Sequence, residues 1–306
     1  MGVWIDTDFG FDDLWAMLAV ARSRVAIDGV SLVFGCATLD VVLGQAGAAQ
    51  KAFGWTFPFH RGRERAILGG AETAERVLGA TGMLSTGRVL PASEPALAGP
   101  AFEALSDWLS RDAAERRILA LGPLSNVAAL CIARPDLAAR VTELVWMGGG
   151  VTSGNHTASA EFNAYADPEA LGVVLAHALP LRMIDLDVCR KVVVSAGDAE
   201  PIRRDGGGNA AVLADLLAGY VSIATSRGRT GMAVYDPVAA VAFLHPELVE
   251  FRPARIEVEL AGIHTRGRTI VDARPSATPN ALYAADLDAD AVRAFCLDVL
   301  LAEASA

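Results

Sequence analysis

Four aspartates stand within eight positions near the start of the chain, in the stretch WIDTDFGFDD (4–13). They form two pairs, Asp6 with Asp8 and Asp12 with Asp13, separated by Phe-Gly-Phe. Carboxylates held this close repel one another, so the charged forms persist only where a cation or hydrogen-bond donors offset the charge. The stretch therefore indicates a metal site, an acidic catalytic pair or an acidic helix start.

Two structural roles explain the stretch only in part. Negative charge at the beginning of a helix is stabilising, which accounts for Asp12 and Asp13 but leaves the first pair without a reason. A calcium loop of the EF-hand type needs Gly at its sixth position and Glu at its twelfth. Counted from the first aspartate, those places hold Phe11 and Met17, so the EF-hand is excluded.

A strand that ends in Asp-x-Asp also resembles the beginning of haloacid-dehalogenase-type phosphatases. That resemblance would make Asp6 a nucleophile and Asp8 its acid partner beside Mg²⁺, with Lys191 as the downstream lysine. The late Asp-Asp metal motif of those enzymes is missing from the sequence, and the second half of the stretch is left unexplained. The phosphatase stays open as a hypothesis for half of the motif.

The elements that must position these residues alternate between strands and helices. We expect strands at 2–5, 25–35, 116–122, 141–150 and 179–187, helices at 12–23, 39–54, 123–134, 167–178, 209–226, 236–245 and 288–304, and an antiparallel pair at 254–262 and 268–274. Asp167 before Pro168 is typical of a helix N-cap followed by proline in the first turn. The alternation predicts an α/β fold with an open, mostly parallel sheet flanked by helices, and a small antiparallel extension near the C-terminus. We expect residues 1–306 to form one domain.

Polar clusters recur directly after the predicted strands. They span residues 6–13, 122–126 and 148–163, and each follows an apolar run. In open parallel sheets, ligands bind beyond the carboxyl ends of the strands. The recurrence predicts that the acidic stretch belongs to a site built at that edge of the sheet.

The composition narrows the class of protein. The 306 residues carry a formal net charge of -10 with a pI of about 5.0, so the basic surface of a nucleic-acid-binding protein is not expected. Cys36, Cys131, Cys189 and Cys296 are widely spaced without a CxxC pair, as in reduced proteins. Apolar runs stay short of the length of a membrane span. We expect a soluble, cytoplasmic protein that binds neither nucleic acid nor membranes.

The complete stretch DTDFGFDD resembles the N-terminal signature of the inosine-uridine preferring nucleoside hydrolases, Asp-x-Asp-x-Gly-x-Asp-Asp. The resemblance continues in order along nearly the whole chain. It includes LGPLSNVA (121–128), ELVWMGGG (143–150), GNHTASAEFNAYADPEA (154–170) and YDPVAAVAF (235–243). Several motifs in one order identify the chain as a member of this family, which implies the family's Rossmann-like nucleoside hydrolase fold.

By this resemblance the protein hydrolyses the N-glycosidic bond of ribonucleosides to ribose and free base, using a bound Ca²⁺. The implied metal ligands are Asp8, Asp13, Asp236 and the backbone carbonyl of Leu121. Asp8 is also the implied catalytic base, taking a proton from a metal-bound water that attacks C1′. Hard oxygen ligands suit calcium, and a divalent cation would offset the repulsion between the aspartates.

The same resemblance implies a ribose site. Asp12 and Asn163 would hold the 2′- and 3′-hydroxyls, Asn155 and Glu161 the 5′-hydroxyl, and Met147 would pack under the sugar. Taken singly, the two asparagines could be turn residues and the methionine a core residue. Their occurrence together, in the order of the family, favours a substrate pocket.

The base side departs from the pattern of the family. Tyr235 stands where well-known members carry a histidine thought to protonate the leaving base, and the stretch VLGATGMLST (77–86) lacks a second histidine. An unperturbed phenol is a poor acid at neutral pH. Tyr235, Tyr220, Arg227 and Arg229 are therefore candidates to contact the leaving group, and the preference for purine or pyrimidine is not specified.

We expect structural and not catalytic roles for two further residues near the motifs. His156 follows Asn155 and is expected to face solvent from a loop, and Cys36 is expected to be a small apolar replacement for an asparagine of many relatives. We expect a calcium-dependent nucleoside hydrolase of purine or pyrimidine salvage, with a nucleoside as its small-molecule partner, acting as a homodimer or homotetramer. The alternatives are a nucleoside- or ribose-binding protein with weak turnover, and a hydrolase of a non-standard ribosyl compound.

Overall fold

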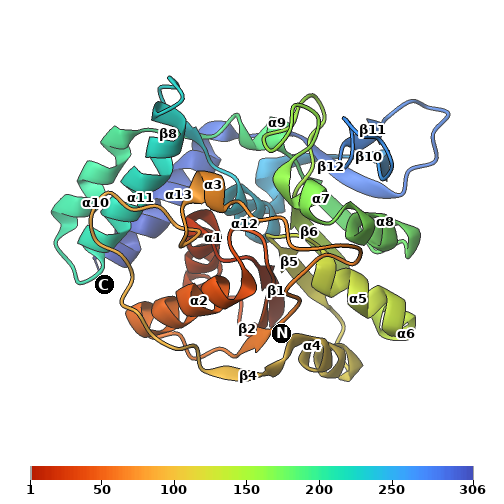
Figure 1. The fold of residues 1–306 in the computed structure, drawn as a ribbon, viewed down its shortest axis with the longest axis horizontal. Coiled ribbons are helices and arrows are strands. Elements are labelled where there is room, and N and C mark those ends of the chain that lie inside the picture. The colour runs from red at the N-terminus through yellow and green to blue at the C-terminus, as the bar shows by residue number, and fades with distance from the viewer. Residues whose placement is uncertain (1, 306) are drawn as a thin grey trace.

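The computed structural model describes residues 2–305 and contains a ten-stranded sheet covered by helices (Figure 1). In order across the sheet the strands are β11 (Thr269–Asp272), β10 (Val249–Val258), β12 (Ala281–Leu287), β7 (Leu181–Ile184), β6 (Glu143–Met147), β5 (Arg117–Ala120), β1 (Val3–Thr7), β2 (Ile27–Leu32), β3 (Phe59–Arg61) and β4 (Leu97–Pro100). From β12 to β4 every neighbouring pair is parallel, whereas β10 is antiparallel to both of its neighbours. The predicted mostly parallel sheet with an antiparallel extension is confirmed.

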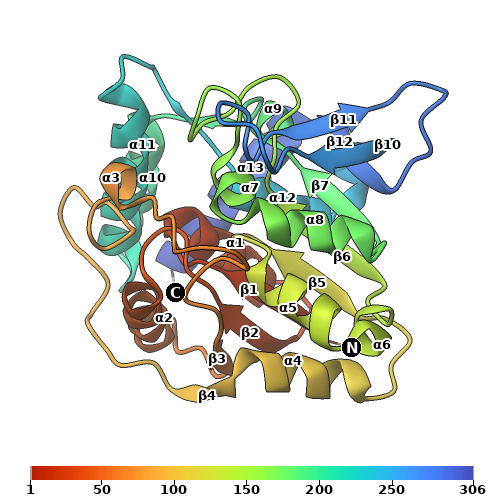
Figure 2. The same ribbon diagram turned by 45° about the vertical axis from the view of Figure 1, so that its right-hand side comes forward.

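Helices pack on both faces of this sheet, as the rotated view makes clear (Figure 2). One face is covered by α1 (Phe11–Arg22), α2 (Leu39–Phe53), α10 (Ala199–Asp205), α11 (Ala210–Thr225), α12 (Asp236–Leu244) and α13 (Ala289–Ala304). The other is covered by α4 (Ala101–Ser110), α5 (Ser125–Ala133), α6 (Pro135–Ala138) and α8 (Pro168–Ala176). Short elements complete the chain: α3 (Glu75–Leu78), α7 (Phe162–Ala166), α9 (Leu186–Cys189), and the two-stranded pair β8 (Val193–Val194) and β9 (Met232–Ala233).

The central strand β1 joins the two hydrophobic cores. Because successive side chains of a strand point to opposite faces, Val3 and Ile5 pack into the core that contains α1, while Trp4 packs into the core that contains α4 and α5. All five residues of the strand are buried. This burial on both faces explains why residues 3–5 of the strand form a continuous apolar run.

The sequence suggested that the acidic stretch follows the first strand. In the structure the stretch begins inside β1. Asp6 is paired in register with Ser31 of β2 and with Ala120 of β5, so only the later three aspartates belong to the loop and helix that follow. Between them Phe9 has a φ of 57°, in the left-handed region that side-chain-bearing residues seldom adopt. This turn leads the chain within three residues from the end of β1 to the start of α1.

Most predicted elements are present, with boundaries shifted by a few residues. The helix predicted from Pro123 begins at Ser125, and Asp167 caps α8 by accepting a hydrogen bond from the Ala170 amide at 3.1 Å. Strand β12, which joins the antiparallel extension to β7, was not predicted, and neither were β4 and α4. Within residues 2–305, no helix combines the length and hydropathy needed to cross a bilayer.

Candidate active site

Three adjacent strands deliver the predicted polar clusters to one edge of the sheet. β1, β5 and β6 are neighbours in the parallel sheet, and the segments after their carboxyl ends line a cavity of about 530 Å³. From the predicted site residues the lining includes Asp8, Asp12, Asp13, Leu121, Met147, Asn155, Glu161, Asn163, Tyr220, Arg227, Tyr235 and Asp236. The structure therefore brings together residues that lie more than 200 positions apart in the sequence.

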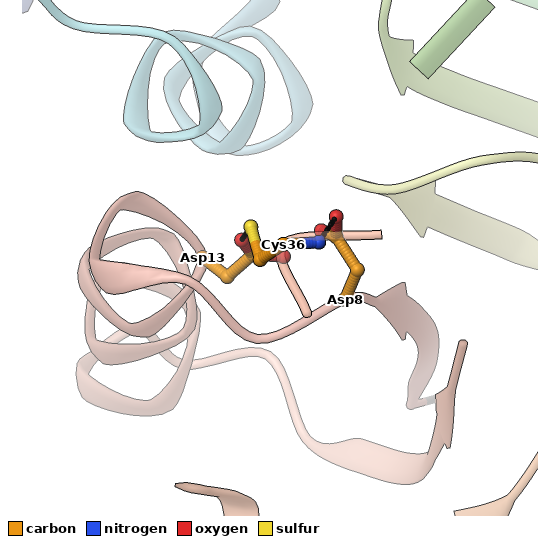
Figure 3. A group of neighbouring side chains, drawn as sticks. All are labelled: Asp8, Asp13 and Cys36. Atoms are coloured by element: carbon orange, nitrogen blue, oxygen red, sulfur yellow. Dashed lines mark hydrogen bonds between the residues drawn. The ribbon is translucent and has the colours of Figure 1, made fainter. Parts of the chain in front are cut away.

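Asp8 and Asp13, which lie on the loop and helix after β1, are fixed by backbone and side-chain donors. The Cys36 amide donates to Asp8 Oδ2 at 2.6 Å, and the Gly10 amide and the Thr7 hydroxyl donate to the two oxygens of Asp13. Figure 3 shows Cys36 lying between these two carboxylates. A side chain on Gly35 would come within 2.1 Å of Asp8 Oδ2, so glycine is required there for the carboxylate to take this position.

The carboxylates of this cluster are held close together in a buried environment. Asp12, Asp13 and Asp236 each place an oxygen within 4.8 Å of the others, and Asp8, Asp13 and the Cys36 thiol do the same. Burial, and then the charge of Asp13, raise the pKa of Asp12 to about 7 and the pKa values of Asp8 and Asp236 well above 3.8. The cluster is thus destabilised by its own charge.

The donor set fits a hard divalent cation. The carboxylate oxygens are accompanied by the Leu121 carbonyl, which lines the same cavity and accepts one hydrogen bond from Asn163 Nδ2 at 2.7 Å. A carbonyl oxygen has a second lone pair, so this bond leaves the oxygen able to bind an ion. Several oxygen ligands with carboxylates among them are what calcium binds in proteins.

Apart from Asp12 on α1, the residues predicted to hold ribose lie at the end of β6 and in the segment after it. Asn163 Nδ2 donates to the Leu121 and Met147 carbonyls at 2.7 and 3.0 Å, which leaves its Oδ1 as an acceptor. The Asn155 side-chain oxygen accepts from the Phe162 amide at 2.9 Å, which leaves its NH₂ group as a donor. Met147 ends β6 and lines the cavity. These polar groups are oriented before any ligand arrives.

Glu161 caps helix α7 in this segment. Its carboxylate accepts hydrogen bonds from the amides of Gly149, Asn163 and Ala164, at 2.8 to 2.9 Å. Burial nevertheless raises the pKa of Glu161 to about 7, because the side chain is only 3% exposed. The capping bonds fix the carboxylate at the edge of the cavity, where it was predicted.

The loop that carries Asn155 is tied to helix α9. Asp187 accepts from the amides of Val151 and Thr152 at 2.7 and 2.9 Å, and also from the Thr152 hydroxyl. Arg190 donates to the Ser153 hydroxyl at 2.9 Å. The loop position therefore depends on a helix that the sequence did not connect with it.

The predicted leaving-group residues take different positions. Tyr220 and Arg227 of the α11 segment and Tyr235 before α12 line the cavity, whereas Arg229 remains on the exposed loop after α11. The Tyr220 hydroxyl lies 2.9 Å from the Ala233 carbonyl and 3.2 Å from Asp12 Oδ2, and its single proton is shared between them. Burial raises the pKa of Tyr235 to about 12.

His156 and Asp6 differ in their position relative to the cavity, because only His156 lines it. His156 was expected to face solvent, but it lines the cavity and contacts Glu72 at 3.2 Å, because a loop from a distant part of the chain covers it. Asp6 lies behind the cavity, where it accepts hydrogen bonds from Ser31 and from Asn126 Nδ2. Cys36 is buried as expected, and burial together with the charge of Asp8 raises the pKa of its thiol.

Comparison with known proteins agrees with this arrangement. Residues 3–294 match the family model described as inosine-uridine preferring nucleoside hydrolase. The chain belongs to this family. As a nucleoside hydrolase, it is 32% identical over 295 residues to the pyrimidine-specific ribonucleoside hydrolase RihA of Citrobacter koseri, covering 94% of this chain and 93% of that protein. It is 31% identical over 296 residues to the RihA protein of Salmonella enteritidis, covering 93% of each.

Solved structures of nucleoside hydrolases share the fold. A purine-preferring ribonucleoside hydrolase from Gardnerella vaginalis has a TM-score of 0.91 at 23% identity, covering 100% of this chain and 99% of that one. An inosine-guanosine nucleoside hydrolase has a TM-score of 0.87 at 25% identity, with 98% of each chain covered. The names of these relatives differ in the base that they specify.

Part of the cavity wall consists of residues that were not predicted from the sequence. Beside the predicted residues, the cavity of the nucleoside hydrolase is lined by Thr73, Ala74, Arg76, Val77, Leu78, His156, Phe162, Ile223 and Met232. Helix α3 and the C-terminal part of α11 lie side by side here in both views (Figures 1 and 2). Most of these side chains are apolar or lie in loops, so their types and spacing carried no chemical signal.

Proposed function

We propose that this nucleoside hydrolase cleaves the N-glycosidic bond of ribonucleosides with Ca²⁺ held by Asp8, Asp13, Asp236 and the Leu121 carbonyl. The observation that supports the proposal most is the presence of a self-repelling carboxylate cluster and an ordered set of hydroxyl-binding groups in one cavity. When bound, Ca²⁺ would neutralise the carboxylates and lower the pKa of nearby water.

Asp8 is the proposed general base. Its Oδ2 is occupied by the Cys36 amide, so Oδ1 is the oxygen available to accept a proton from the attacking water. The bond to C1′ forms from the water oxygen while the bond from C1′ to the base nitrogen breaks. Carboxylates around the site would stabilise the positive charge that develops on the sugar in an oxocarbenium-like transition state.

The ribose would be held by groups that the fold has already oriented. The free Oδ1 of Asn163 and the Asp12 carboxylate can accept from the 2′- and 3′-hydroxyls, and the NH₂ group of Asn155 and the Glu161 carboxylate can bind the 5′-hydroxyl. Met147 would pack against the sugar. Because little side-chain freedom remains to be lost on binding, this preorganisation favours a defined position of C1′.

The test is release of ribose from a panel of nucleosides. The panel contains uridine, cytidine, inosine, adenosine and guanosine, together with ribosyl compounds that carry other leaving groups. We expect turnover of at least one substrate, loss of turnover after treatment with a calcium chelator, and recovery on addition of Ca²⁺. Failure of calcium-loaded protein to release ribose from any member of the panel would falsify the proposal.

A hydrolase of a non-standard ribosyl compound is the second candidate. It is favoured by the base side of the cavity, where burial holds the pKa of Tyr235 at about 12 and apolar residues of α3 form the wall. This candidate predicts that a ribosyl compound outside the five common nucleosides is turned over with the highest kcat/KM. The same panel distinguishes the two.

A further inference from the structure

Cleavage of an N-glycosidic bond leaves a base that needs a proton, and the predicted donors are unsuited to supply it. Burial raises the pKa of Tyr235 to about 12, and also raises that of Tyr220, whose hydroxyl is already engaged by Asp12 and Ala233. Arg227 is exposed on the segment after α11. The structure must provide a different acid if the base is protonated by a side chain.

His156 is a titratable side chain that lines the same cavity as the acidic cluster. Its Nε2 lies 3.2 Å from Glu72 Oε1, and its ring is packed at 4.6 Å from the ring of Tyr165 and edge-on at 5.4 Å from Phe162. Only 17% of the side chain is exposed. His156 and Phe162 both line the cavity that contains Asp8, so the imidazole is accessible from the substrate site.

We propose that His156 is the general acid that protonates the departing base, and that Glu72 positions its ring. The proposal rests on the function proposed above. The contact with Glu72 occupies Nε2, so the proton to be transferred is the one on Nδ1 of the imidazolium. The ring packs against the rings of Tyr165 and Phe162, which restricts the direction of that proton.

The step is balanced in atoms and charge. The bond from C1′ to the base nitrogen breaks, its electron pair stays on the base, and the base takes the Nδ1 proton of His156. The water oxygen bonds to C1′, and the water proton passes to Asp8. Solvent then reprotonates His156 and removes the proton from Asp8, so the net reaction is nucleoside plus water to ribose plus base.

The charged groups around His156 set its titration. They are Glu72 on the loop before α3 and Arg76 on α3, while the ring of Tyr165 on α7 packs against the imidazole. Burial lowers the pKa of His156 below 6.5, Arg76 lowers it further, and Glu72 opposes both by stabilising the imidazolium. The protonated acid is therefore depleted at a lower pH than for a free imidazole, and kcat should fall as the pH rises through that range.

The experiment compares His156→Gln with the wild-type enzyme on two kinds of riboside. A natural nucleoside needs a protonated leaving group, whereas a riboside of 4-nitrophenol releases a stable anion without one. We expect kcat for the best nucleoside to fall by about 10²-fold, and kcat for the 4-nitrophenyl riboside to stay close to the wild-type value. His264→Gln, at an exposed position, is the matched control and should change neither.

Glu72→Gln provides a second readout that a merely structural contact would not give. It should move the pH at which kcat for nucleosides declines to a lower value, because the imidazolium loses its carboxylate partner. Equal losses by His156→Gln on both ribosides, or no loss on nucleosides, overturn the inference while leaving the proposed hydrolase intact. A wild-type enzyme that releases ribose from neither substrate overturns both.

Discussion

The Tyr220 hydroxyl lies 3.2 Å from Asp12 Oδ2, although the two residues are 208 positions apart in the sequence. The phenol comes from α11, and the carboxylate from the first turn of α1. Tyr220 was predicted to be near the leaving base, but its hydroxyl faces a carboxylate that we propose binds the ribose. This geometry indicates that Tyr220 orients the Asp12 carboxylate.

Tyr220→Phe tests that role. Loss of the hydroxyl removes one donor from Asp12, and a hydrogen bond to a charged group is worth about 1.5 kcal/mol or more, so kcat/KM should fall about tenfold. The ratio of kcat/KM for a ribonucleoside to that for its 2′,3′-dideoxy analogue should fall as well, because the analogue lacks both hydroxyls that the oriented carboxylate could bind. Tyr283→Phe, on β12, is the control. An equal loss on both substrates would show that Tyr220 does not act through Asp12.

Asp236→Asn should separate charge repulsion from ion binding. In the presence of chelator the variant should be more stable to unfolding than the wild type by roughly 1–2 kcal/mol, because a buried repelling charge is removed. With Ca²⁺ at about 100 times its Kd, the wild type should gain about 2.7 kcal/mol of unfolding free energy. The variant should gain much less.

These stabilities are measured by denaturant unfolding with and without Ca²⁺, and calcium affinity by calorimetry. Asp107→Asn, which removes an exposed aspartate from α4, serves as a charge-matched control and should behave like the wild type. A wild-type protein whose unfolding is unchanged by Ca²⁺ would contradict the assignment of these aspartates as a calcium site.

Two aspartates near α9 should affect the pH dependence of stability in opposite ways. Asp185 is fully buried, and burial raises its pKa to about 7. Because the folded state holds this proton more tightly than the unfolded state, its contribution to the free energy of unfolding is present at low pH and is lost as the pH rises through 7. Asp187 is only partly buried, and although that burial acts to raise its pKa, the hydrogen bonds from Thr152 and Val151 lower it below 3.8.

Asp185→Asn should therefore flatten the decline in unfolding free energy between pH 5 and pH 8, by up to about 1.4 kcal/mol per pH unit. Asp187→Asn should lower the free energy of unfolding equally at pH 5 and at pH 8. The reason is that the contribution of Asp187 is lost only below about pH 4. Denaturant unfolding at four pH values in saturating Ca²⁺ measures both. A steeper decline in Asp185→Asn than in the wild type would contradict the buried, proton-holding state of this side chain.

The sequence specified the parts of the site that are local in the chain. The aspartates of 4–13 and the polar residues after β6 lie within short motifs, and the parallel sheet follows from alternating apolar strands and helices. The contacts that were missed join distant segments. His156 is covered by Glu72, which is 84 positions earlier, and local periodicity carries no information about such a contact.

The missed strand β12 has a similar cause. Its sequence, ALYAADL, does not alternate between apolar and polar residues, and only Ala284 is buried. A short apolar segment without that alternation does not distinguish a strand from other structure. The extension was thus predicted as a hairpin, whereas the structure inserts a third strand that makes it continuous with the sheet.

Asp6 and Asp8 provide the most direct test of the chemistry, because they are alternate residues of one motif with different surroundings. Asp8 lines the cavity, so Asp8→Asn should lower kcat for ribose release by 10²- to 10⁴-fold, the usual contribution of a general base. Asp6 is held behind the cavity by Ser31 and Asn126, and Asp6→Asn retains an oxygen that can accept both bonds. Its kcat should stay close to that of the wild type. Loss of activity in Asp6→Asn together with phosphate release from a phosphoester by the wild type would instead support the phosphatase chemistry that Asp-x-Asp also suggests.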